Sequence, residues 1–194
     1  MVKKLLRDYC LIKYRSLPLQ HFDKETNSDI LYSPNHEGVY WIKSPESKEN
    51  NSEKLIQELI NLISSLNIND LIFLNEINLP WISKYTAQRK DSKQLTTALN
   101  YFKSKNIWTD FNGGVLVCKI ELKDFLLNFY TITKHDSGFF FYNFTDEKQK
   151  IIFYLHYSGD IQVITLTEEM NISFLKQIKN TSFIDCGRQD SNKI

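Results

Sequence analysis

Three polar residues in the second half of the chain have the types and spacing of a metal-dependent hydrolytic site. Glu121 follows Asp110 by eleven residues, and Lys123 follows Glu121 by two. Two carboxylates can bind Mg²⁺, which prefers oxygen ligands, and the bound ion lowers the pKa of a coordinated water. A nearby lysine could help to activate that water. This chemistry requires the three side chains to converge on one point.

An apolar run, VLVCKIELK (115–123), ends in the Glu-x-Lys of this group and predicts a strand. The arrangement resembles the acid, acid-x-lysine pattern of the restriction-endonuclease-like nucleases. The resemblance implies Asp110 and Glu121 as metal ligands and Lys123 as the water-assisting residue. It covers about fifteen residues, no proline precedes Asp110, and helical spacing begins at Leu122. A Mg-dependent nuclease is therefore an alternative function.

Other catalytic and cofactor signatures are absent from the sequence. It contains no GxSxG, no GxGxxG, no P-loop and no CxxC pair. None of the four histidines has the i, i+4 spacing of a zinc-binding helix. His156, in an aromatic segment, could act as a general base, but a histidine on a sheet face fits the same pattern. We therefore expect a non-catalytic protein without a metal or cofactor.

Residues 21–37 (HFDKETNSDILYSPNHE) are polar and rich in turn-forming residues, which predicts a long loop. Acids on such a loop would steer a basic partner, and a tyrosine would anchor it. A nuclease active site, built to hold phosphates, is a partner of this kind. We predict partner binding by Asp23, Glu25, Asp29, Tyr32, His36 and Glu37.

Charge is unevenly distributed along a chain whose net charge is only +1. Residues 21–80 contain ten acids and four lysines, a net of −6, whereas residues 81–119 contain seven bases and two acids, a net of +5. If the two segments occupy different faces, the protein has a dipole that steers charged partners. Two ordinary solvated surfaces are the alternative interpretation.

The basic stretch supplies a further alternative function, nucleic-acid binding. Lysines and arginines alternate with aromatic residues over 81–108, as a phosphate-contacting face would require. Most of these aromatics fall on the predicted buried face of a helix. The chain also lacks the basic excess of most nucleic-acid-binding domains, so we expect no direct contact with nucleic acid.

The strands and helices expected along the chain, which must position these residues, indicate one α+β domain over residues 1–194. Its sheet is expected to be mixed and mainly antiparallel, with about four helices. Strands are expected at 8–14, 38–43, 71–77, 106–111, 115–122, 139–144, 150–157 and 160–166. Asn112-Gly113-Gly114 predicts a hairpin turn, and the last three strands predict a meander. Helices are expected at 52–66, 91–102, 122–130 and 167–178, followed by a loose tail from about 181.

The N-terminal residues have a basic start but lack the apolar run of a signal peptide, and no stretch of 18 apolar residues occurs. We therefore expect a cytoplasmic protein that does not contact membranes.

The length, the Ile/Lys/Asn-rich and Ala-poor composition, the aromatic meander at 139–166 and the acidic stretch 21–37 together resemble the immunity proteins of bacterial polymorphic toxin systems, including contact-dependent growth inhibition. The resemblance implies a protein that binds and neutralises a cognate toxin domain, such as a nuclease, by capping its active site. These families share no motif, so no residue role is transferred.

Overall fold

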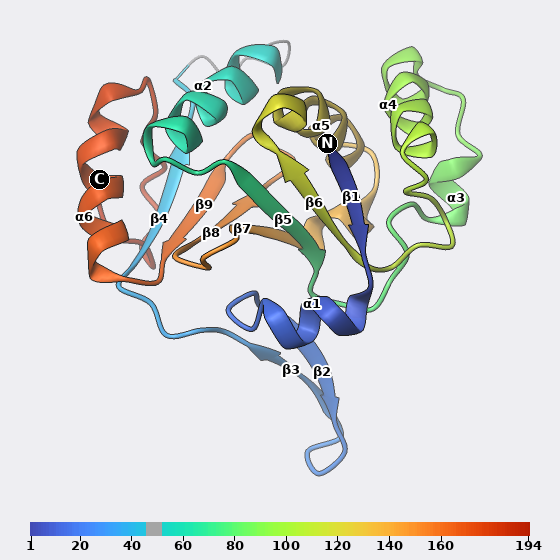
Figure 1. The fold of residues 1–194 in the computed structure, drawn as a ribbon, viewed down its shortest axis with the longest axis horizontal. Helices are drawn as coiled ribbons and strands as arrows, with labels where there is room; N and C mark the ends of the chain where they lie inside the picture. Colours follow the sequence, from blue (N-terminus) through green and yellow to red (C-terminus); the bar gives the residue numbers. More distant parts are fainter. Residues whose placement is uncertain (46–51) are drawn as a thin grey trace.

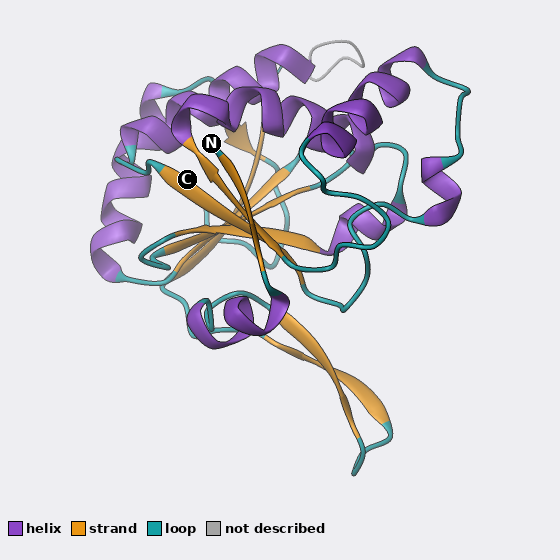
Figure 2. Ribbon diagram, turned by 45° about the vertical axis from the view of Figure 1, so that its right-hand side comes forward, coloured by secondary structure: helices purple, strands orange, loops and turns teal. Residues whose placement is uncertain are grey.

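One large sheet with helices on both faces forms the body of the protein (Figures 1 and 2). The computed structural model describes residues 1–45 and 52–194, with residues 21–23 and 29 described by their backbone alone. Within these residues the sheet has the strand order β1-β6-β5-β7-β8-β9-β4-β10, and β2 and β3 form a separate two-stranded unit. All the described strand pairs are antiparallel, which confirms the predicted α+β class.

The strands are β1 Val2–Leu5, β2 Leu19–Asp23, β3 Ser28–Tyr32, β4 Gly38–Lys43, β5 Asp70–Asn75, β6 Gly114–Cys118, β7 Tyr142–Asp146, β8 Ile151–Leu155, β9 Ile161–Thr165 and β10 Ile184–Asp185. The helices are α1 Arg7–Lys13, α2 Ser52–Ser65, α3 Lys84–Ala87, α4 Lys93–Ser104, α5 Lys119–Thr133 and α6 Glu168–Gln177, with 3₁₀ turns at Ser137–Phe141 and Ile178–Asn180.

The two faces of the sheet bury different cores. Successive residues of a strand point to opposite faces, so Phe73 joins the large core under α2, α4, α5 and α6, whereas Ile72 joins a smaller core under α1. Phe73 stacks on Phe144 of β7 with 4.6 Å between ring centroids. Because both faces of β5 are covered, its middle residues are all buried, as the apolar run at 71–77 predicts.

Several other predicted elements are confirmed. The helix expected at 52–66 is α2, and Asn67 follows it with a φ of 57°, the left-handed conformation that often ends a helix. The strand at 38–43 is β4, and β7, β8 and β9 form the predicted meander. Thr167 caps α6 by accepting a hydrogen bond from the Met170 backbone N–H.

The strand predicted at 8–14 is wrong, because these residues form α1. Cys10 and Tyr14, one helical turn apart, are buried together with Leu17 against the sheet. Leu6, Tyr9 and Ile12 instead face solvent. In a helix this short, two buried positions are too few to distinguish helical periodicity from the alternation of a strand.

The hairpin predicted at Asn112-Gly113-Gly114 is also wrong. Residues 106–111 form no strand, and β6 pairs instead with β1 and β5. The two glycines serve close packing, since a Cβ on Gly113 would lie 2.0 Å from the Leu5 carbonyl oxygen and one on Gly114 would lie 2.5 Å from Cys10 Sγ. Neither glycine has the positive φ of a hairpin turn.

The C-terminal residues, expected to be loose, are attached to the sheet. Phe183 is buried, and β10 pairs with β4. Farther on, the guanidinium of Arg188 stacks on the Trp41 ring, and the Asn192 side chain accepts a hydrogen bond from the Val39 N–H over 2.8 Å. The expected strand at 139–144 is likewise shorter, because its first residues belong to the 3₁₀ turn that ends at Phe141.

Candidate functional site

Asp110, Glu121 and Lys123 do not form the arrangement that the nuclease pattern requires. The strand predicted to carry Glu121 and Lys123 ends at Cys118, and both residues lie on α5 instead. Two residues apart on a helix, they project on nearly opposite sides, about 200° apart at 100° per residue. Asp110 is exposed in the loop before β6.

Glu121 already has cationic partners. Its carboxylate accepts a hydrogen bond from Lys105 Nζ over 2.7 Å and lies 3.5 Å from the N-terminal ammonium. The hydrogen bond from Lys105 holds the pKa of Glu121 below its usual value. Among residues 1–45 and 52–194, no group of three His, Cys, Asp or Glu side chains could hold a metal ion.

His156 is half-buried just beyond β8 rather than inside a strand. Its Nδ1 lies 2.6 Å from the Ser158 hydroxyl, and its ring contacts the Tyr157 ring at 4.1 Å between centroids. Burial lowers the pKa of His156. The His156 ring therefore interacts with neighbouring residues of the same turn.

The aromatics of the basic stretch are largely internal. Trp81 and Phe102 are buried in the large core, where the Trp81 indole donates a hydrogen bond to the Gly113 carbonyl over 2.8 Å. Arg89 pairs with Asp91 at 2.6 Å. Tyr85 is exposed, but the alternating pattern of bases and aromatics does not form one continuous face.

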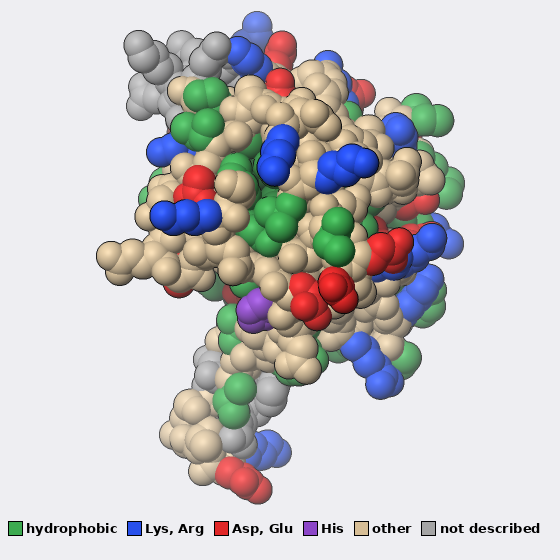
Figure 3. All heavy atoms as spheres, turned by 90° about the vertical axis from the view of Figure 1, so that its left-hand side faces the viewer, with side chains coloured by type: hydrophobic (Ala, Val, Ile, Leu, Met, Phe, Trp, Pro, Cys, Tyr) green, Lys and Arg blue, Asp and Glu red, His purple; other side chains and the backbone are tan. Residues whose placement is uncertain are grey.

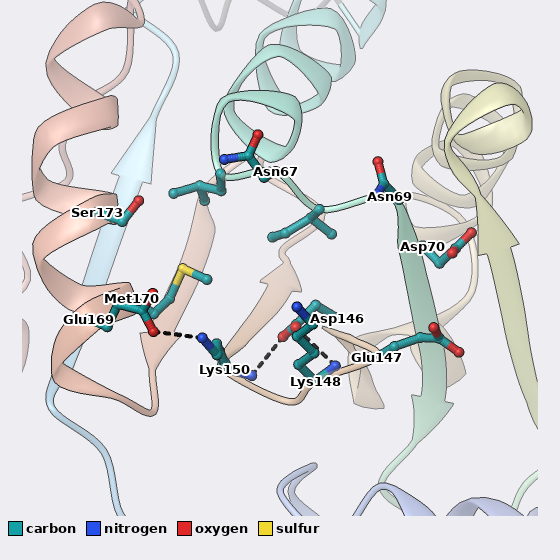
Figure 4. Close-up of a pocket in the computed structure, with 12 residues that line it drawn as sticks. Asn67, Asn69, Asp70, Asp146, Glu147, Lys148, Lys150, Glu169, Met170 and Ser173 are labelled. Atoms are coloured by element: carbon teal, nitrogen blue, oxygen red, sulfur yellow. Dashed lines mark hydrogen bonds and ion pairs between the residues drawn. The ribbon is translucent and has the colours of Figure 1, made fainter.

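A polar depression of about 330 Å³ lies at the ends of central strands, between α2, α6 and the β7–β8 turn (Figure 4). Three of its charged side chains, Asp146, Lys150 and Glu169, have structural partners. Asp146, which is buried, accepts hydrogen bonds from the backbone N–H groups of Lys148 and Lys150 over 3.0 and 2.7 Å, which closes the turn. The Lys150 ammonium pairs with Glu169 of α6 at 2.7 Å. The depression is thus a junction between elements.

The stretch 21–37, predicted to be a long loop, is mostly a β-hairpin that projects from the body (Figures 1, 2 and 3). Leu19 pairs with Tyr32 at its root and Asp23 with Ser28 near its tip. These residues show no alternating pattern because the hairpin reaches into solvent and has no buried face that would require one. It is fastened at its root, where Gln20 N–H donates to the Glu76 carbonyl over 2.9 Å.

The six predicted partner-binding residues are therefore spread along this projection. Glu25 lies in the exposed tip, and Asp23 and Asp29 flank the tip on β2 and β3, with side chains outside the described part of the structure. Tyr32, which is 49% exposed, lies at the root, about 13 Å from the start of β3 at ~3.3 Å per residue. His36 and Glu37 are exposed on the linker to β4, where Glu37 N–H donates to the Thr165 carbonyl over 2.8 Å.

Apolar side chains that the sequence did not single out lie beside these acids. Ile30 and Leu31 of β3 are 39% and 51% exposed. On α1, which lies on the same side of the sheet as the hairpin (Figures 1 and 2), Leu6, Tyr9 and Ile12 are also exposed. Exposed apolar and tyrosine side chains gathered near one end of a protein are typical of a protein-binding surface.

The acids of residues 21–80 do not form one face. The hairpin and α2, which both contain acids from this stretch, lie on opposite sides of the sheet (Figure 1). Glu46 and Glu49 lie outside the described residues. The hairpin thus receives only part of the predicted negative charge.

The chain matches no known protein-family model, no curated protein and no solved structure. None of the described helices is long and apolar enough to cross a membrane.

Proposed function

We propose that this is a non-catalytic protein-binding protein of the cytoplasm, an immunity protein that binds a cognate toxin domain and neutralises it. The observation that supports this function best is the β2–β3 hairpin, which projects from the body with exposed Ile30, Leu31 and Tyr32. Isolated two-stranded hairpins are marginally stable in water, and a partner would supply the packing that this one lacks.

The chemistry of the hairpin suits a basic, concave partner. A narrow projection can enter an active-site cleft, where exposed tyrosine and aliphatic side chains anchor it. The acids of its tip would meet the phosphate-binding groups of a nuclease, and their charge would accelerate the encounter. Within the described residues β2 and β3 pair with no third strand, so the outer edge of β3 could also add to a sheet of the toxin.

The test is a pull-down of the tagged protein from its native cells, with mass spectrometry of the proteins that co-purify. We expect a stoichiometric toxin domain in the eluate. Ile30→Ser with Tyr32→Ser should remove it, because both side chains are exposed on the hairpin and contribute to no described core.

A matched control is Tyr85→Ser with Ile172→Ser, which removes two exposed side chains from other elements. The control should retain the toxin. Equal retention by both folded variants would exclude the hairpin as the interface, and a repeatedly empty eluate from the wild-type protein would overturn the proposed function itself.

A further inference from the structure

A second cavity lies on the same face of the sheet as α1, over a part of the sheet that α1 does not cover. It measures about 370 Å³ and is open to solvent on one side. The strands β7, β8 and β9, the linker that follows the hairpin, and Pro18 and Leu31 at the root of the hairpin form its walls. At ~30 Å³ per water, this volume equals on the order of ten water molecules. Pro34 of the linker is buried and closes one side.

The register of the sheet lines up the polar groups of this cavity. Asn143 of β7 is opposite Tyr154 of β8, and Tyr154 is opposite Gln162 of β9. All three line the cavity, and they present amide oxygens beside an aromatic ring. Phe140 adds a second ring, and Glu76, just after β5, adds a carboxylate.

Glu76 is half-buried, and no cation among the described side chains is paired with it. The interaction that favours its charged form is a hydrogen bond from the Asn143 side chain. Arg188, the basic group that influences Tyr154 from the same face, is engaged in stacking on Trp41 and lies 3.7 Å from Asp160. Desolvation raises the pKa of Glu76 to about 7.

A half-buried carboxylate without a counter-ion is costly to maintain and is typical of a site that receives one. The surrounding groups indicate which cation. A planar guanidinium stacks on aromatic rings and donates several hydrogen bonds in one plane, whereas an ammonium is a compact, strongly hydrated charge. The amide oxygens of Asn143 and Gln162 can accept the donors that Glu76 leaves free.

We propose that this cavity binds an alkyl guanidinium group, with Glu76 as its counter-ion and the rings of Tyr154 and Phe140 as its walls. The group could belong to a small molecule or to an arginine side chain of another protein. The cavity adjoins the proposed toxin-binding surface, because Leu31 of the hairpin and His36 of the linker also line it. A titration with a small ligand alone tests this site separately from toxin binding.

The test is a titration of the full-length protein with butylguanidinium at pH 8, followed by calorimetry and by the side-chain amide signals of Asn143 and Gln162 in NMR spectra. We expect saturable binding with a dissociation constant on the order of 1 mM, reasonable for so small a ligand. Glu76→Gln should weaken it about 10- to 100-fold, since a hydrogen bond to a charged group is lost. Neutral butylurea should not bind.

Glu168→Gln is the matched control, because it removes an exposed carboxylate that lies outside the cavity. It should bind like the wild type. Absence of saturable binding, or equal affinity of the Glu76→Gln variant and the wild type, would overturn the proposal. Thermal unfolding of both variants verifies that they are folded.

A second titration distinguishes the two sources of the group. A capped Gly-Arg-Gly peptide that binds at least as tightly as butylguanidinium supports an arginine side chain of a partner protein. Binding of butylguanidinium alone supports a free small molecule. In either case affinity should increase as pH rises through about 7, because Glu76 loses its proton there.

Discussion

The hydroxyl of Tyr40 donates a 2.6 Å hydrogen bond to the side-chain oxygen of Asn171 and so joins β4 to α6. The Tyr40 side chain is buried, and its ring also packs on Phe174 of the same helix. Asn171 accepts a second bond, from the Thr165 hydroxyl over 2.9 Å. One amide thus satisfies two buried hydroxyls at the place where helix and sheet meet.

Asn171→Ala should lower the free energy of unfolding by about 1 to 3 kcal/mol, because the buried Tyr40 hydroxyl loses its acceptor. Thr165 can turn to the Gly38 carbonyl, 3.4 Å away, which limits the cost. Urea unfolding measures the difference. Asn180→Ala, which removes only a surface bond to Gln177, is the control and should change little; equal losses in the two variants would contradict the assignment.

Gly113→Ala should lower the free energy of unfolding by about 3 kcal/mol or more, because overpacking a rigid site forces its surroundings to move. The new Cβ would meet the Leu5 carbonyl of β1, and a backbone atom cannot rotate away. Gly187→Ala provides the comparison. Its Cβ would meet nothing within 4 Å, and its φ of 73° costs only about 1 to 2 kcal/mol. Thermal or urea unfolding in which Gly187→Ala is the more damaging change would refute the packing role of Gly113.

Glu76→Gln should make the protein more stable than the wild type at pH 8 and change it least near pH 4. Burial raises the pKa of Glu76 from its ordinary value of 4.5 to about 7. The folded state therefore holds a proton that the unfolded chain releases, and this stability is lost as pH rises from about 4.5 through 7. The loss is at most about 3 kcal/mol at ~1.36 kcal/mol per pKa unit, and smaller where water screens the carboxylate.

Urea unfolding at several pH values between 4 and 8 measures this difference, with Glu37→Gln as the control for removal of an exposed carboxylate. A difference between wild type and Glu76→Gln that does not vary with pH would show that folding leaves the pKa of Glu76 unchanged, and would contradict the prediction.

Replacement of the four acids of the hairpin and linker, Asp23, Glu25, Asp29 and Glu37, by Ala should slow association with the toxin about tenfold at low salt and leave dissociation nearly unchanged. The difference should shrink at high salt, where the field is screened. Stopped-flow or surface-binding kinetics measure both rates. The control replaces four exposed acids elsewhere: Asp124, Glu147, Glu168 and Asp190. Similar association rates in the two variants would remove the hairpin charge from the encounter.

The elements that could be predicted are those whose side chains face one broad core. In α2 the residues Leu55, Ile56, Leu59, Leu62 and Ile63 are all buried, so the helical spacing of apolar residues repeats along the helix. The hairpin was not predicted because solvent surrounds it, so that no buried face imposes a periodic pattern of apolar residues. Helix α1 was missed because its exposed Leu6, Tyr9 and Ile12 obscure the buried pair that defines its inner face.

The candidate sites were only partly predictable, because they depend on register and on distant neighbours. Composition proposed a set of partner-binding residues, and these stay a prediction. It did not show that the set extends from the tip of the hairpin at Glu25 to the linker at Glu37. The cavity could not be inferred at all. Asn143, Tyr154 and Gln162 look like ordinary strand residues until the pairing of β7, β8 and β9 places them in one row beside Glu76.

The position of β4 within the sheet has a consequence for how the protein folds during synthesis. Its strand partner on the meander side is β9, and Ile42 pairs with Ile161, about 120 residues later. At ~5 to 20 residues per second, the ribosome needs on the order of 10 s to deliver β9 after β4 has emerged. For that interval the segment Val-Tyr-Trp-Ile is an apolar strand without its β9 partner, which makes it a binding site for chaperones and a place where the growing chain can aggregate.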